Sequence, residues 1–311
     1  MVSNILLADR TDFLGSNFVA KMGTFIYGKL NNYDTFHDKN MLYKDSMFIA
    51  PFVQFTKERS NCKESIIEYD EKTNQGNIRL LQARPVVQLK QDLVSYFREN
   101  YKKEFFEIIS TIAKERNYKL PWNDSSRIAC IHIRLYDDHW HEGATHSDYD
   151  GSGSSYYMRR LMENDNIDAF SKKEVVEYCK KNNFFDALRG EHPDRQVAID
   201  INKLNCLIKN FKNLNPEKEI HVVTKLTNNP ANKKYVDLCN EYNVPIHSSD
   251  DYDYDLWLMI NSDILALSKS TYSLVAGYFH QGSTVHYPLW GVFTSVGLYT
   301  NYDKSGWTYY I

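Results

Sequence analysis

The chain has 311 residues, of which 42% are hydrophobic and 25% charged, a balance typical of a globular protein and unlike that of a disordered or fibrous one. Its net charge of -3 argues against a general nucleic-acid binder, because such proteins usually carry a basic excess that neutralises phosphates. No stretch approaches the roughly 18 apolar residues of a membrane span, and the first residues lack the basic start and apolar core of a signal peptide.

The first 120 residues predict strands that alternate with helices. The predicted elements are a strand over 4–8, a polar loop over 9–17, a helix over 17–30, a strand over 47–53 and a long helix over 86–118. The run Leu120-Pro121-Trp122-Asn123-Asp124 breaks this pattern. We therefore expect two domains, an N-terminal lobe of residues 1–120 and a C-terminal lobe of residues 121–311.

The C-terminal lobe predicts the same alternation. The predicted strands cover 127–133, 219–224, 244–247, 263–267 and 284–287, and the predicted helices cover 172–181, 200–211, 230–242, 256–262 and 271–280. Alternating strands and helices favour an α/β fold with parallel sheets. Because such sheets place ligands at the carboxyl ends of their strands, loops 9–17, 132–155 and 268–273 are the candidate site segments.

The segment HIRLYD, residues 132–137, ends the first strand of this lobe. In a strand, residues two apart face the same way, so His132 and Arg134 share a side. An Arg fork at a strand end can grip a phosphate with two hydrogen bonds and a permanent charge. The alternative is an exposed Arg134 paired with Asp137.

A second motif, DLWLMINSDILALSKSTYS, covers residues 255–273. Ser270, Thr271 and the N–H groups of the helix that they begin could cradle a phosphate or a ribose. Asp255 could accept hydrogen bonds from the amino group of a base. The alternative is that Asp255 and Ser270 are ordinary helix N-caps. In the first loop, Gly15 allows close approach of the backbone to a ligand, and Ser16 and Asn17 follow it.

The order of these motifs resembles the fucosyltransferases of GT-B-type architecture, which include the α1,2- and α1,6-fucosyltransferases and the protein O-fucosyltransferases. The similar segments are FLGSNF at 13–18, HIRLYD at 132–137 and the motif at 255–273. The resemblance covers the first loop and roughly residues 127–290. It implies two Rossmann-like lobes with parallel sheets that face a central cleft.

The resemblance also implies a role for each matching residue. Arg134 would hold the β-phosphate of GDP-fucose, His132 and Asp255 would contact guanine, and Ser270 and Thr271 would contact phosphate or ribose. Gly15 and Asn17 would belong to the donor site. Leu135 departs from the family pattern, which usually has a second Arg there, and this removes a positive charge from the diphosphate site.

The resemblance points to Glu142, ten residues after His132, as the base that deprotonates the acceptor hydroxyl. Asp138, His139, His141 and His146 compete for that role. The three histidines fit no strong zinc pattern, so we expect no metal and no other cofactor. The expected activity is metal-independent, inverting transfer of L-fucose from GDP-fucose to a glycan acceptor.

Three other interpretations are open. A metal-dependent GT-A-type transferase would use a DxD motif, present as Asp251 and Asp253 and again at 148–150. A catalytically inactive relative that only binds a nucleotide sugar or a glycan would agree with Leu135. A dinucleotide-dependent oxidoreductase is disfavoured because no G-x-G-x-x-G follows the first strand.

The five cysteines are scattered without a CxxC pair, so the sequence predicts neither a zinc site nor a disulfide framework. We therefore expect a reducing, cytoplasmic setting. The expected partners are a nucleotide sugar and a glycan, without nucleic acid and without a membrane span. The sequence leaves the oligomeric state and the identity of the acceptor open.

Overall fold

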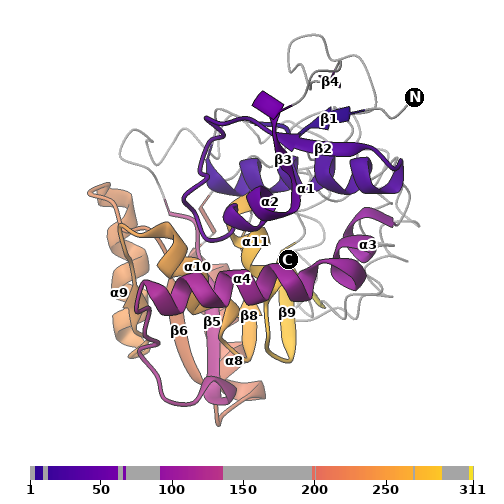
Figure 1. Cartoon of the computed structure of the whole chain (residues 1–311). Coiled ribbons are helices and arrows are strands. Elements are labelled where there is room, and N and C mark those ends of the chain that lie inside the picture. The colour runs from indigo at the N-terminus through magenta and orange to yellow at the C-terminus, as the bar shows by residue number, and fades with distance from the viewer. Residues whose placement is uncertain are drawn as a thin grey trace, which may run out of the picture. The chain divides into compact units, whose positions relative to one another are not determined.

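The computed structural model describes residues 4–9, 13–61, 66–67, 92–135, 198–199, 201–268, 270–288 and 308–310. These residues form two compact units, the first within Met1–Lys119 and the second within Leu120–Ser295 and Ser305–Ile311. Each unit is an α/β structure whose described strands pair in parallel, as in Rossmann-like folds (Figure 1). Among the described residues, no helix combines the length and the apolar character that crossing a bilayer requires.

The first unit contains a sheet of four described strands in the order β3-β2-β1-β4. Its elements are β1 (Asn4–Leu6), α1 (Leu14–Leu30), β2 (Asp34–His37), α2 (Ala50–Phe55), β3 (Lys57–Glu58), η1 (Arg59–Asn61), β4 (Ile66–Ile67), α3 (Asp92–Asn100) and α4 (Lys102–Glu115). Strand β1 pairs with β2 on one side and with β4 on the other. The order therefore reverses at β1.

Aromatic side chains form the core between the helices of this unit. Phe18 and Phe25, seven residues apart on one stripe of α1, contact Phe52 at centroid distances of 5.7 and 5.8 Å, and Phe105 packs 4.9 Å from Phe52. A neighbouring stripe of α1 lies close to the sheet at Gly28, where a Cβ would come within 2.4 Å of Thr35 Cγ2. Glycine at this position allows the helix to approach β1 and β2.

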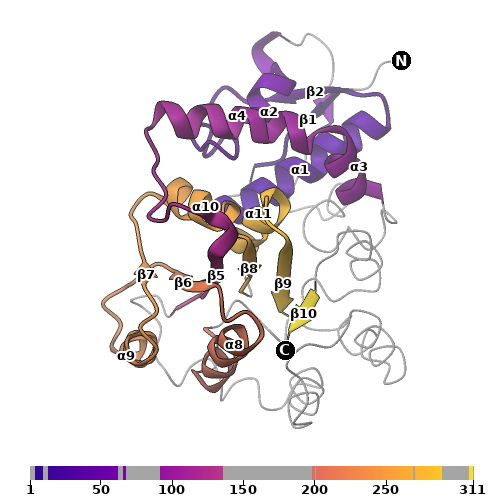
Figure 2. The same cartoon turned by 90° about the horizontal axis from the view of Figure 1, so that it is seen from below.

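The second unit contains a sheet of six described strands in the order β10-β9-β8-β5-β6-β7. Its elements are η4 (Ser125–Arg127), β5 (Ile128–His132), α8 (Ile201–Leu214), β6 (Glu219–Val223), η6 (Pro230–Asn232), α9 (Lys233–Glu241), β7 (Ile246–His247), α10 (Tyr252–Ile260), β8 (Ile264–Ala266), α11 (Thr271–Phe279), β9 (Thr284–Pro288) and β10 (Thr308–Tyr310). Helices α8 and α9 cover one face of this sheet, and α10 and α11 cover the other (Figure 2).

Strand β5 is buried along its whole length, which fits its central place in the sheet. Alternate residues of β5 face opposite sides. Ala129 and Ile131 join the apolar core under α8 and α9, together with Ile220 and Val222 of β6. His132 is the last residue of β5, so the residues after it emerge at the carboxyl edge of the sheet.

Two predicted elements differ from the observed ones. Residues 47–53, predicted as a strand, form turns followed by α2, because Pro51 favours the first turn of a helix and the apolar run does not distinguish the two states. The described part of the predicted helix 86–118 consists of α3 and α4, which are separated at Tyr101 with φ -134°. Strand β2 was not predicted. The predicted helix 172–181 lies outside the described residues.

Candidate functional site

The carboxyl ends of β5 and β8 form the topological switch point of the second sheet. The chain continues from β5 to β6 and β7 on one side and returns to β8 and β9 on the other. Residues Ile131 and Ala266 are register partners, so the loops that follow these strands diverge from neighbouring points. In open parallel sheets, ligands bind in the crevice that such divergence leaves. The predicted residues His132, Arg134, Ser270 and Thr271 all follow these two strands.

His132 is fixed at this switch point. Its Nδ1 lies 2.7 Å from Ser268 Oγ, and its ring centroid lies 5.7 Å from that of Tyr272. The imidazole is 7% exposed. Burial, and next the charge of Arg134, lower the pKa of His132 to about 3, so the ring is neutral at physiological pH. A neutral, hydrogen-bonded imidazole can position a ligand without contributing charge.

Arg134 lies two residues beyond β5 and is partly exposed. Its effect on the pKa of His132 shows that its charge is close to that ring. The next residue, Leu135, is 5% exposed and belongs to the apolar core under α8 and α9. Because residue 135 packs in this core, it does not supply the second positive charge that the family pattern has at the edge of the sheet. Asp137, the predicted alternative partner of Arg134, lies outside the described residues.

Ser270 is the N-cap of α11, as one of the two interpretations predicted. Its Oγ accepts the N–H of Tyr272 at 3.2 Å. The turn before it is held by Ser273, whose Oγ donates to the carbonyl of Ser270 at 3.0 Å and accepts the N–H of Ser268 at 3.2 Å. Thr271 is the first residue of the helix. The N-terminus of α11 therefore begins in a preorganised turn, next to the end of β5, where a helix dipole favours an anion.

Asp255 does not open α10, contrary to the sequence prediction. The N-cap is Asp251, whose Oδ1 accepts the N–H groups of Asp253 at 3.0 Å and Tyr254 at 3.3 Å. Asp255 lies inside the helix and is 5% exposed. Its Oδ2 accepts the N–H of Ser249 at 3.4 Å, whereas its Oδ1 is buried and has no hydrogen-bond partner among the residues that the structure describes.

The environment of Asp255 penalises its charge. Burial raises the pKa of its carboxyl group to about 7, while the Ser249 N–H and the charge of Lys225 oppose the rise. A buried acceptor without a partner costs free energy, and a ligand that donates a hydrogen bond would recover it. Asp255 therefore holds a buried acceptor that a donor group could satisfy.

Asp251 and Asp253, the two aspartates of the DxD alternative, have structural roles in α10. Asp251 caps the helix, and the Asp253 side chain is 1% exposed. Within the part of the chain that the structure describes, no group of three or more His, Cys, Asp or Glu residues is placed to hold a metal ion. Asp148 and Asp150 lie outside that part.

Gly15 and Asn17 are not in a loop, because α1 begins at Leu14. The predicted loop is wrong because the apolar pattern of the helix extends through Leu14 and Phe18, and a glycine in the first turn does not prevent helix formation. Asn17 is fully buried. Its Oδ1 accepts from Lys21 Nζ at 3.1 Å, and its Nδ2 donates to the carbonyl of Phe13 at 3.5 Å. The structure therefore gives Asn17 a role in fixing the start of α1.

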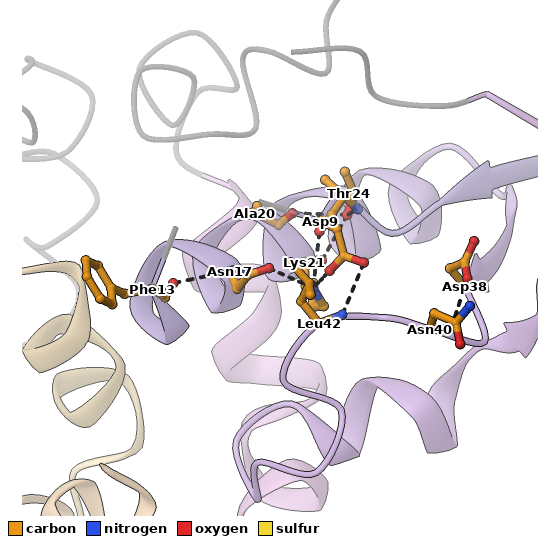
Figure 3. Close-up of polar contacts among 10 residues, drawn as sticks. Asp9, Phe13, Asn17, Ala20, Lys21, Thr24, Asp38, Asn40 and Leu42 are labelled. Carbon is orange, nitrogen blue, oxygen red and sulfur yellow. Dashed lines mark hydrogen bonds and ion pairs between the residues drawn. The ribbon is translucent and has the colours of Figure 1, made fainter. Parts of the chain in front are cut away.

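Two residues that the sequence analysis did not select form a buried ion pair beyond β1. The ammonium of Lys21, which has no exposed surface, contacts Asp9 Oδ1, while Asp9 Oδ2 accepts the N–H of Leu42 at 3.3 Å (Figure 3). Burial lowers the pKa of Lys21, and the contact with Asp9 opposes this effect. The available signal was a lysine between Phe18 and Phe25 on an apolar helix face.

The predicted catalytic base, Glu142, lies outside the described residues. The same holds for its competitors Asp138, His139, His141 and His146. In the described part of the second unit, His132 and Arg134 lie at the end of β5, Ser270 and Thr271 follow the neighbouring strand β8, and Asp255 lies in α10 with Ser249 as its hydrogen-bond donor.

No protein-family model matches the chain, and no curated protein matches its sequence. Among solved structures, the chain is similar to POFUT1 in complex with GDP, with 11% identity and a TM-score of 0.27 over 82% of this chain and 63% of that one. It is also similar to POFUT1 in complex with GDP-fucose, with 10% identity and a TM-score of 0.28 over 90% of this chain and 71% of that one. The chain thus spans less than two thirds of the first of these structures. Likenesses of this size do not assign a family.

Proposed function

We propose that the chain is a glycosyltransferase that transfers L-fucose from GDP-fucose to a glycan acceptor, with inversion and without a metal ion. The observation that carries this proposal is the arrangement at the switch point of the second sheet, at the carboxyl ends of β5 and β8. It combines an arginine after β5 with a helix N-terminus after β8, and α10 of the same unit carries Asp255, whose buried Oδ1 has no hydrogen-bond partner among the described residues. A nucleoside diphosphate offers the complementary groups, namely two phosphates and a base with N–H donors.

Each described residue has a chemical role in this proposal. Arg134 and the N-terminus of α11 would hold the diphosphate, because both supply N–H donors and positive potential that do not titrate. Asp255 Oδ1 would accept from the N–H groups of guanine, and neutral His132 would help to orient the base. Ionisation of Asp255 then accompanies nucleotide binding.

The reaction follows from the fate of the leaving group. The bond between the anomeric carbon and the β-phosphate oxygen breaks, and its electron pair stays on GDP. The acceptor oxygen bonds to the opposite face of the sugar, and its proton passes to a base, for which Glu142 remains our candidate. Stabilising the diphosphate is the task of Arg134 and α11, in the manner of an oxyanion site. The proposal includes a GT-B-type architecture with one lobe for the donor and one for the acceptor.

A nucleotide screen tests this proposal. We expect GDP, and not UDP, CDP or dTDP, to raise the melting temperature of the purified protein, and we expect EDTA to leave that shift unchanged. Loss of the shift with EDTA would favour the metal-dependent alternative. The absence of a shift with GDP would refute the assignment of the donor. GDP binding without any release of fucose from GDP-fucose would favour an inactive relative, which the buried position of Leu135 also allows.

A further inference from the structure

The buried pair Asp9–Lys21 lies at the switch point of the first sheet. Strand β1 is flanked by β2 and β4, so the strand order reverses there as it does at β5 in the second sheet. Asp9 is three residues beyond the carboxyl end of β1. By the same topological rule, this edge is where the first unit would bind a ligand.

Two groups fix the carboxylate of Asp9. Lys21 contacts Oδ1, and the N–H of Leu42, from the loop that follows β2, donates to Oδ2 at 3.3 Å. Lys21 is itself anchored by Asn17 Oδ1 at 3.1 Å and by the carbonyl of Ala8 at 3.5 Å. Figure 3 shows these contacts converging from α1, from the end of β1 and from the loop at Leu42. The carboxylate is therefore held in one orientation.

Stability alone explains this pair poorly. Burying an ammonium costs several kcal/mol, and well-packed apolar residues at such positions are often equally or more stabilising. The Lys21 side chain is 0% exposed, whereas that of Asp9 is 32% exposed. The buried Lys21 thus holds in place a carboxylate that solvent and ligands can reach.

The charges at this edge select the class of ligand. The buried ammonium neutralises the carboxylate, which makes the pair a poor site for a cation. The reachable member is an acceptor with spare lone pairs, so it would accept from hydroxyl groups, whereas a phosphate offers mainly acceptor oxygens. Leu42, whose amide donates to Asp9, is 41% exposed and places an apolar residue on the adjoining loop. Neutral sugars present hydroxyl groups next to C–H faces.

We propose that Asp9 binds hydroxyl groups of a neutral sugar ligand at the carboxyl edge of the first sheet, with Lys21 as its positioning residue and Leu42 as the apolar part of the site. This inference rests on the proposed function in naming that ligand as the glycan acceptor.

Sugar binding to the full chain tests the inference. We would titrate wild-type protein with lactose, N-acetyllactosamine, chitobiose and maltose at millimolar concentration and follow saturation-transfer NMR signals. At least one disaccharide should bind to the wild-type protein. D9N should weaken this binding roughly tenfold, because the ionised acceptor is lost while the side chain keeps its shape. L42A should weaken it by a smaller factor. The control D34N removes an exposed carboxylate that pairs with Lys57 in the same unit and should have no effect.

The outcomes separate the two proposals. GDP binding, measured on the same samples, should be the same for wild type and D9N. Failure to bind any of the four sugars, or equal sugar binding by wild type, D9N and L42A, would overturn the sugar site whatever GDP does. Sugar binding that depends on Asp9, in a protein that does not bind GDP, would keep this site and reject the proposed function. L42A leaves the ion pair intact, so the test stands even if D9N folds poorly.

Discussion

His132 Nδ1 and Ser268 Oγ lie 2.7 Å apart and join the carboxyl ends of β5 and β8, although 136 positions separate them in the chain. This bond spans the point at which the strand order of the second sheet reverses. It fixes the imidazole where a ligand of an open parallel sheet is expected, and it leaves Arg134 two residues farther along the same chain segment.

The first prediction concerns the ionisation of His132. Because burial lowers its pKa to about 3, its ring should not titrate between pH 8 and about 4. Its native state then binds fewer protons than the unfolded chain below pH 6.5, so this group makes folding less favourable as the pH falls. Long-range proton–nitrogen NMR, with the H132N variant for assignment, measures the titration. A midpoint near 6.5 would contradict the buried position.

The pKa shift of Asp255 has the opposite effect on how folding stability depends on pH. Its folded pKa of about 7 lies above the ordinary value of 3.8, so the native state holds a proton that the unfolded chain has released between these values. The stability contribution of Asp255 should fall as the pH rises through this window, by at most about 1.4 kcal/mol per pH unit. D255N should therefore be more stable than wild type at pH 8 and bind GDP more weakly. Urea unfolding at pH 5 and 8 measures the first effect, with D237N, which removes an exposed carboxylate of α9, as the control.

Arg134 should matter for nucleotide binding and not for folding. It is partly exposed and lies beyond β5, so R134A should retain the wild-type melting temperature without ligand. Loss of charge-assisted hydrogen bonds to phosphate should weaken GDP binding by roughly 10- to 100-fold. The affinity of R134K should lie between those of wild type and R134A, because lysine keeps the charge without the guanidinium fork. Calorimetric titration measures this. R127A removes an exposed arginine at the other end of β5 and is the matched control; equal losses in both variants would argue against a specific role.

The Asp9–Lys21 pair should show strong energetic coupling. K21M leaves the Oδ1 of Asn17 and the carbonyl of Ala8 without their buried donor, so we expect a loss of about 3 kcal/mol in unfolding free energy. D9N should cost at least as much, since it leaves the fully buried ammonium of Lys21 without its counter-charge, and the double variant should cost less than the sum of the two. The exposed pair Lys57–Asp34 supplies the control cycle, in which coupling should stay below about 1 kcal/mol. Additive effects at Asp9 and Lys21 would show that the two charges act independently.

Much of the second unit was predictable from local sequence. The strands β5, β6, β8 and β9 and the helices α8, α9 and α11 lie within a few residues of their predicted ranges, because each combines a clear apolar period with a turn or cap signal. In the first unit, β1 and α1 were predicted because β1 lies in an apolar run, whereas β2 (DTFH) and β3 (KE) consist mostly of polar residues and show no such run.

The sequence by itself determined which residue types carry chemistry and their order along the chain, since HIRLYD and the Ser/Thr-rich turn at 268–273 can be read from neighbouring residues alone. Only the tertiary structure decided which of them meet. The strand order placed His132 against Ser268, and the packing of α1 on β1 turned Lys21 toward Asp9. The burial of α10 left an oxygen of Asp255 without a partner among the described residues. Strand order, burial and ion pairing depend on contacts between distant segments, which no local periodicity encodes.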